Sequence, residues 1–184
     1  MNKGLQKLSL SFSPPSKPSE TGIDSQWSEV EQKLGWILPS DYKALIENYG
    51  TGCWLDFLWV LNPFSENVNL NLLDQAEIIL EGERLVKSKY PDMIPFVLHP
   101  EKGGLFPWAI TDNGDRLFWL TDDETGVFQI VVYESRGPEY EVYDLSCSEF
   151  LLQWLSGELR VGIFPDEFEY NKKDAFTPYQ ATFG

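Results

Sequence analysis

The segment from Leu34 to Gly50, which reads LGWILPSDYKALIENYG, constrains the fold more than any other part of the chain. Pro39 suits the first turn of a helix, where a missing backbone N–H costs no hydrogen bond, and Asp41 places a carboxylate near the positive end of the helix dipole. An apolar stripe then recurs at i, i+3, i+4 and i+7, the spacing of one buried helix face. The stripe consists of Tyr42, Leu45, Ile46 and Tyr49. Gly50 follows where a left-handed cap is favoured, so the segment predicts a short helix that docks on a core.

Apolar periodicity predicts three further helices. The first begins at Asp24 or Ser25, either of which can cap it. The second covers about residues 70–89. Ser146 and Glu149 are spaced as a capping box in front of an apolar run, which predicts a third helix close to the C-terminus.

Several strands are expected as well. An apolar run from Trp54 to Leu61 predicts one central strand. Asn113 and Gly114 lie at the centre of a short polar connection that is typical of a hairpin, because both residue types tolerate positive φ. The remaining strands are expected at residues 105–111, 116–120, 127–134 and 140–143.

This order of elements indicates an α+β fold, with a mostly antiparallel sheet packed against N-terminal helices and one C-terminal helix. We expect residues 1–23, which are rich in Ser and Pro, to form a flexible arm, although a short edge strand is also compatible with their alternation. Residues 24–168 are expected to form a single domain, long enough for a substantial core, and residues 169–184 a C-terminal tail.

The chain is strongly acidic. It carries 14 Lys and Arg against 29 Asp and Glu, for a formal net charge of −15. Such a surface repels nucleic acid and anionic membranes and favours a basic protein partner, whose association it accelerates. The alternative interpretation is that acidity only keeps the protein soluble.

Few residues could carry chemistry. His99 is the only histidine, and no G-x-S-x-G motif supplies a nucleophile. Cys53 and Cys147 are the only cysteines, so a zinc site lacks enough ligands and a disulfide framework is not indicated. We therefore expect a protein that is not an enzyme and has no metal or other cofactor. No apolar run approaches the roughly 18 residues of a membrane span, and no signal peptide is evident, so a cytoplasmic location is expected.

The strongest candidate for a binding surface is the acidic region around the predicted hairpin. Its carboxylates are Asp112, Asp115, Asp122, Asp123 and Glu124. Trp108 and Trp119 flank it, and tryptophan is a common interface anchor. Turn formation and solvation are the simpler explanation of these acids, and core packing is the simpler explanation of the tryptophans.

Three blocks of the chain together resemble the SUKH superfamily. They are the LGxxLPxDY…YG pattern from Leu34 to Gly50, the run GGLFPWAITDNGDRLFWL from Gly103 to Leu120, and FLLQWLSGEL from Phe150 to Leu159. The superfamily comprises bacterial immunity proteins and a yeast regulator of cell-wall synthesis. The resemblance implies a protein that neutralises a toxin domain, often a nuclease, by direct binding. A regulatory scaffold is the alternative that it leaves open, and a hydrolase that uses paired carboxylates is a third.

Overall fold

The computed structural model describes residues 3–122 and 127–180, which form five α-helices, one 3₁₀ turn and seven β-strands. The helices are α1 (Lys3–Ser11), α2 (Asp24–Leu34), α3 (Ser40–Tyr49), α4 (Leu72–Lys89) and α5 (Cys147–Leu155), and the 3₁₀ turn is η1 (Pro91–Met93). The strands are β1 (Gly52–Trp54), β2 (Leu58–Val60), β3 (Phe106–Thr111), β4 (Arg116–Asp122), β5 (Val127–Tyr133), β6 (Tyr140–Tyr143) and β7 (Phe176–Pro178). The expected α+β class is confirmed.

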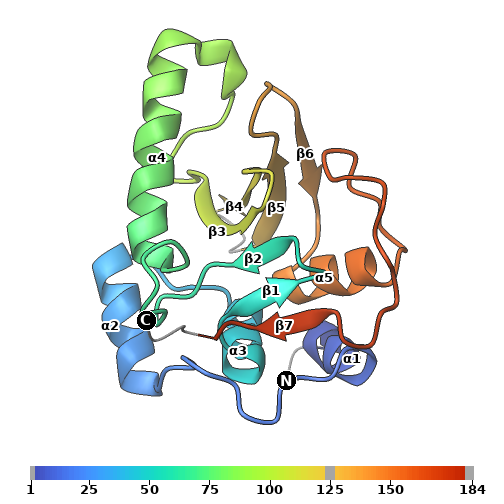
Figure 1. The fold of residues 1–184 in the computed structure, drawn as a ribbon. Helices are drawn as coiled ribbons and strands as arrows, with labels where there is room; N and C mark the ends of the chain where they lie inside the picture. Colours follow the sequence, from blue (N-terminus) through green and yellow to red (C-terminus); the bar gives the residue numbers. More distant parts are fainter. Residues whose placement is uncertain (1–2, 123–126, 181–184) are drawn as a thin grey trace.

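All seven strands belong to one sheet with the order β6-β5-β4-β3-β2-β1-β7, and every neighbouring pair is antiparallel. Strands β1 to β6 follow one another as a meander. The last strand, β7, returns to the β1 edge, as Figure 1 shows. The predicted hairpin is confirmed as β3 and β4, and Gly114 in its turn has a φ of 87°.

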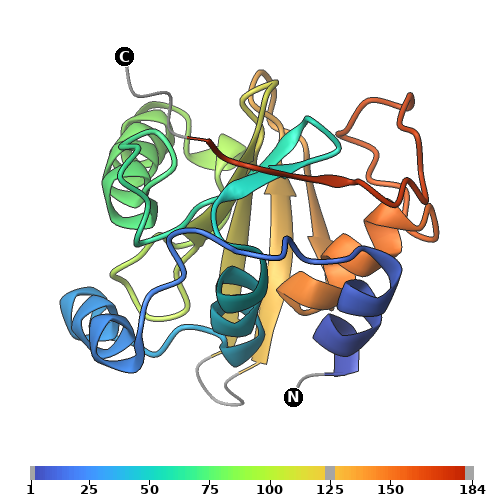
Figure 2. The same cartoon turned by 60° about the horizontal axis from the view of Figure 1, so that its bottom comes forward.

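Helices cover both faces of the sheet (Figure 2). On one face, the Trp119 ring of β4 lies 4.9 Å from the Tyr42 ring of α3. On the other face, Glu83 of α4 forms an ion pair with Arg116 of β4. Since Arg116 and Trp119 are separated by three positions and side chains alternate along a strand, the two contacts define opposite faces.

The expected helix after Pro39 is confirmed as α3, and its predicted stripe is buried. Pro39 lies directly before the helix rather than inside it, with a φ of −54°. Gly50 ends the helix with a φ of 70°, and a Cβ at this position would lie only 2.1 Å from the Ser19 carbonyl oxygen. Position 50 therefore requires glycine for both conformation and space.

Local capping signals were also informative. The predicted capping box at the start of α5 is present, with hydrogen bonds between Ser146 and Glu149 in both directions. Helix α4 begins at Leu72, where the Asn71 side chain accepts from the backbone of Leu73 and Asp74. Both caps satisfy amides that otherwise lack an intrahelical partner.

The predicted central strand at residues 54–61 is wrong, because the segment forms two strands, β1 and β2, with a tight turn between them. Leu55 and Asp56 both have a φ of 51°, and together with Phe57 they form a three-residue loop between the paired residues Trp54 and Leu58. The turn is held from outside, since the Leu55 amide donates to the Ala175 carbonyl at 2.7 Å. Tertiary contact thus imposes a conformation that neither residue type favours alone.

The expected flexible arm is also corrected in its first half. Residues 3–11 form α1, and Leu5, Leu8 and Phe12 are buried in the core. The Tyr49 hydroxyl donates to the Phe12 carbonyl at 2.6 Å and fixes the end of this segment. Near the other end of the chain, β7 lies inside the expected tail. The division into residues 1–23, 24–168 and 169–184 itself stays a prediction.

Candidate functional site

The β3–β4 turn presents only part of the predicted acidic surface. Asp112 is exposed and accepts a hydrogen bond from the indole Nε1 of Trp59 at 2.8 Å. Asp115 is buried at 3% exposure, where its carboxylate accepts from the Thr111 hydroxyl and the Ser135 amide, each at 3.0 Å. Asp115 therefore stabilises the turn and is not available to a partner.

The other predicted carboxylates lie elsewhere. Asp122 is the last residue of β4, whereas Asp115 immediately precedes that strand. A strand of this length separates the backbone at its two ends by about 20 Å, so residues 115 and 122 lie at opposite ends of β4. Asp123 and Glu124 lie outside the residues that the structure describes.

The expectation that Trp108 and Trp119 anchor a partner is corrected, because both are 0% exposed. Their rings are stacked with centroids 6.0 Å apart, and the Trp119 Nε1 donates to the Cys147 Sγ at 3.0 Å. Both point into the layer between the sheet and helices α3 and α5. Core packing accounts for them, as is usual for large aromatic side chains.

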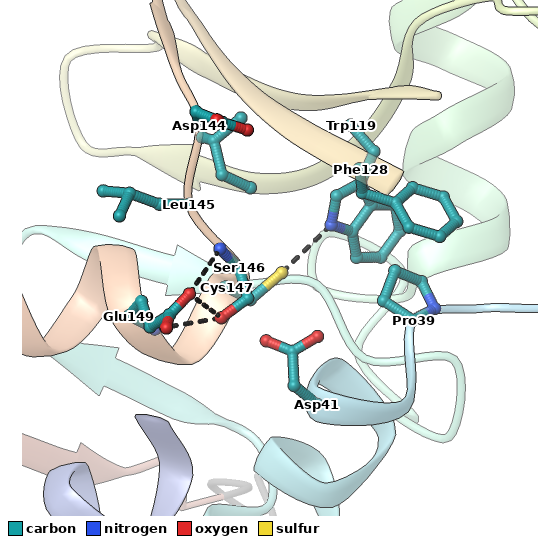
Figure 3. Close-up of a pocket in the computed structure, with 10 residues that line it drawn as sticks. Pro39, Asp41, Trp119, Phe128, Asp144, Leu145, Ser146, Cys147 and Glu149 are labelled. Carbon is teal, nitrogen blue, oxygen red and sulfur yellow. Dashed lines mark hydrogen bonds between the residues drawn. The ribbon is translucent and has the colours of Figure 1, made fainter. Parts of the chain in front are cut away.

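The structure instead forms a pocket of about 260 Å³ where α3, the sheet and the start of α5 meet (Figure 3). Three carboxylates line it: Asp41, Asp144 and Glu149. No lysine, arginine or histidine is among the described residues of its lining. We call this the acidic pocket.

The carboxylates of the acidic pocket come from α3 and from the continuous segment that leads into α5. The first turn of α3 contributes Asp41, the connection from β6 to α5 contributes Asp144, and the first turn of α5 contributes Glu149. Trp119 and Phe128 supply aromatic walls. In the sheet register Phe128 lies opposite Thr121, next to the end of β4, so the pocket lies toward the end of the hairpin that carries Asp122.

Two of the three carboxylates also hold the start of α5. Figure 3 shows Asp41 next to this helical turn, and its Oδ2 accepts from the Ser148 amide at 3.0 Å and from the Ser148 hydroxyl at 3.3 Å. The Glu149 Oε2 accepts from the Ser146 amide and hydroxyl at 3.1 and 2.8 Å. Because these anions already occupy the positive end of the helix dipole, the pocket disfavours a further anion and favours a cation.

Asp144 is the carboxylate of the pocket that is exposed and not engaged in a helix cap. None of the hydrogen bonds or ion pairs within the described ranges involves its side chain. It is thus the carboxylate of the pocket for which the described residues supply no partner.

Sequence reasoning found the two cap residues but not the site. The sequence indicates that Asp41 belongs to a first helical turn and that Glu149 is half of a capping box. Nothing in a single sequence indicates that positions 41 and 149 meet, since their contact depends on how α3 and α5 pack on the sheet. The one available indication was that both are acids at helix starts in an acidic chain.

The thiol of Cys147 also faces the acidic pocket. Burial, and after it the Asp41 carboxylate, holds the pKa of this thiol well above its usual range. Burial likewise raises the pKa of Cys53 to about 12. Since the thiolate is the reactive form, neither cysteine has the properties of a nucleophile at neutral pH.

In the folded protein at pH 8, neither thiol is therefore expected to react with iodoacetamide. A pKa of about 12 leaves only about one Cys53 side chain in ten thousand as thiolate. Mass spectrometry should detect no adduct in native buffer and two adducts in guanidinium chloride. Ser16→Cys, which adds an exposed thiol, is the control and should gain one adduct in native buffer. Rapid native labelling of Cys147 would show that the pocket opens.

His99 lies away from these thiols, in a cavity of about 430 Å³ that Trp36 and Phe106 also line. Its ring lies 5.1 Å from that of Phe106 in an edge-to-face contact. Burial, and after it the charge of Arg84, lowers the pKa of His99. Among the described residues, no hydrogen bond joins this imidazole to a serine or cysteine, so a nucleophile–base pair is not formed there.

Two further properties concern metal ions and membranes. Across residues 3–122 and 127–180, no group of three His, Cys, Asp or Glu side chains could hold a metal ion. None of the helices that the structure describes combines the length and apolar character of a membrane span.

A sheet covered by helices on both faces, with an acidic and partly aromatic pocket where two helices pack, defines an α+β domain. A family model described as SUKH_6, SMI1-KNR4 cell-wall, matches residues 24–151, which include all three carboxylates of the acidic pocket. The match covers more than half of the chain, and the chain belongs to this family. No curated protein and no solved structure gives a significant match. The SUKH family generally consists of non-catalytic immunity and regulatory domains, and the chain fits such a role.

Proposed function

We propose that this protein is a non-enzymatic immunity protein that binds a basic toxin domain and neutralises it. The observation that carries the proposal is the acidic pocket, which Asp41, Asp144 and Glu149 line together. None of its described lining residues is basic. Family membership supports an immunity role, and the net charge of −15 supports a cationic partner.

The physical basis is charge complementarity. A domain that cleaves nucleic acid holds phosphate with Lys and Arg, so its active site is basic. An acidic protein associates rapidly with such a surface and can cover it. A cytoplasmic location follows from this proposal, because the toxin would act inside the cell.

The acidic pocket has the properties expected of a receptor for one cationic side chain. Its volume of about 260 Å³ is below the 300–1,000 Å³ of most small-molecule sites. Asp144 offers an exposed carboxylate, and the Phe128 ring offers a face for a guanidinium or ammonium group. We therefore propose that a lysine or arginine of the partner enters here. Asp112 remains a second, separate candidate contact.

Co-expression tests the proposal. The chain should restore growth to cells that express the toxin domain encoded beside its gene, and the two proteins should co-purify in a complex of defined stoichiometry. A folded chain that neither restores growth nor forms the complex would refute the immunity role. Retention of several endogenous proteins instead, without a toxin, would favour the regulatory role.

A further inference from the structure

A second cavity, of about 280 Å³, lies between α4 and the opposite face of the sheet. Glu83 from the middle of α4 reaches it, as do Arg116 at the start of β4 and Tyr133 at the end of β5. Arg116 and Tyr133 are paired in the register of the two strands. The acidic pocket uses Trp119 on the other face, so the two sites are separate.

Two polar side chains of this cavity are deeply buried and only partly paired. Glu83 is 5% exposed and Tyr133 is 3% exposed. The Glu83 Oε1 lies 3.1 Å from the Arg116 Nη1, an ion pair without the geometry of a hydrogen bond. Burial raises the pKa of Glu83 and the Arg116 guanidinium opposes the rise, as expected when a carboxylate is buried beside its counter-ion.

Three buried polar atoms in this cavity form no hydrogen bond within the part of the chain that the structure describes. They are the Glu83 Oε1, the Arg116 Nε and the Tyr133 hydroxyl. Buried polar groups in folded proteins are normally satisfied, and leaving one unpaired costs free energy. Their convergence on one cavity indicates a site that a bound molecule completes.

We infer that this cavity binds a small neutral carboxamide. Arg116 Nε offers a donor, Tyr133 a hydroxyl that can donate, and Glu83 Oε1 an acceptor. A carboxamide presents a matching carbonyl oxygen and N–H group. Glu83 and Arg116 neutralise each other, so the three unpaired buried atoms carry no net charge between them. Arg136 also lines the cavity, but its side chain is exposed to solvent, which screens its charge.

The apolar residues of the cavity wall indicate which group the amide of the ligand carries. Val86, Met93 and Ile94 line the cavity beside the polar atoms. They favour a short aliphatic chain attached to the amide, since apolar surface is buried as the chain lengthens. The volume far exceeds the roughly 30 Å³ of one water molecule, so there is space for such a ligand.

Titration with three probes of similar length tests the inference: butyramide, butyrate and n-butylammonium. Binding is monitored through the backbone amide shifts in ¹H–¹⁵N NMR spectra of the full chain. Butyramide should give saturable shifts centred on residues 83, 116 and 133. Acetamide should bind more weakly, because it buries less apolar surface. The two charged probes should bind at least about tenfold more weakly, because an ion loses its hydration here and the ion pair, which has no net charge, does not compensate the loss. No saturation with butyramide would overturn the inference and indicate that the cavity holds only water. Equal affinity for all three probes would overturn it too.

Tyr133→Phe removes one unpartnered hydroxyl and keeps the ring, so folding should persist. It should weaken butyramide binding about three- to tenfold, the effect of one hydrogen bond. Tyr140→Phe is the matched control, because the Tyr140 ring stacks on Tyr133 at 5.8 Å but does not line the cavity. Unchanged binding by Tyr133→Phe, or equal loss in both variants, would contradict the proposed site.

Discussion

Replacing Leu5 and Leu8 together by alanine is expected to destabilise the protein by about 4–8 kcal/mol, which is most of the stability of a typical domain. Both side chains are buried, at 2% and 0% exposure, between α1 and its neighbours. Each truncation removes apolar contact and leaves a cavity that the surrounding core fills only in part. Urea unfolding followed by tryptophan fluorescence measures the loss.

Leu10→Ala is the matched control for this prediction. Leu10 belongs to the same helix but is 85% exposed, so its truncation should change the free energy of unfolding by no more than about 0.5 kcal/mol. If the double variant were as stable as Leu10→Ala, α1 would not be part of the core. The prediction matters because α1 precedes the region that the family model matches.

Asp144→Lys is expected to weaken binding of the basic partner by about a hundredfold, provided that the proposed function is correct. The substitution places a cation beside Asp41 and Glu149, where it occupies the acidic pocket and repels the incoming side chain. Folding should be preserved, because Asp144 is exposed. Surface plasmon resonance at two salt concentrations measures the association and dissociation rates separately. The association rate of Asp144→Lys should be lower than that of the wild type at low salt and should approach it at high salt, where charges are screened.

The control is Glu77→Lys, which changes the net charge by the same amount. Glu77 is exposed on α4, away from the residues that line the acidic pocket. It should weaken binding by less than about threefold. Equal losses in the two variants would show that only net charge matters and would remove the acidic pocket from the interface.

Elements with local signals could be predicted from the sequence. The α3 helix, the α5 capping box and the Asn113–Gly114 turn each depend on residues within a few positions of one another. Such patterns act through backbone conformation and capping, so they are readable without the rest of the fold.

Elements that depend on tertiary contact could not be predicted from the sequence. Helix α1 has nine residues, two of them serines, and is too short to be stable on its own. It forms because its apolar side chains are buried. The Leu55–Asp56 turn contains no glycine or asparagine that would indicate it in the sequence. The candidate site could not be predicted for the same reason, since the acidic pocket joins residues about a hundred positions apart. The burial of Trp108 and Trp119 likewise depends on how the helices pack on the sheet.

The pairing of β7 with β1 has a consequence for synthesis. Gly52 lies opposite Pro178, and the Tyr179 amide donates to the Thr51 carbonyl, so this edge of the sheet is completed by residues made long after β1. During translation the backbone amides and carbonyls of β1 face solvent on that side until the last strand leaves the ribosome. An unpaired strand edge is a template for association with other chains. The emerging polypeptide thus keeps this open edge until β7 has been made, and ribosome-bound chains truncated before Phe176 should aggregate more readily than chains that include β7.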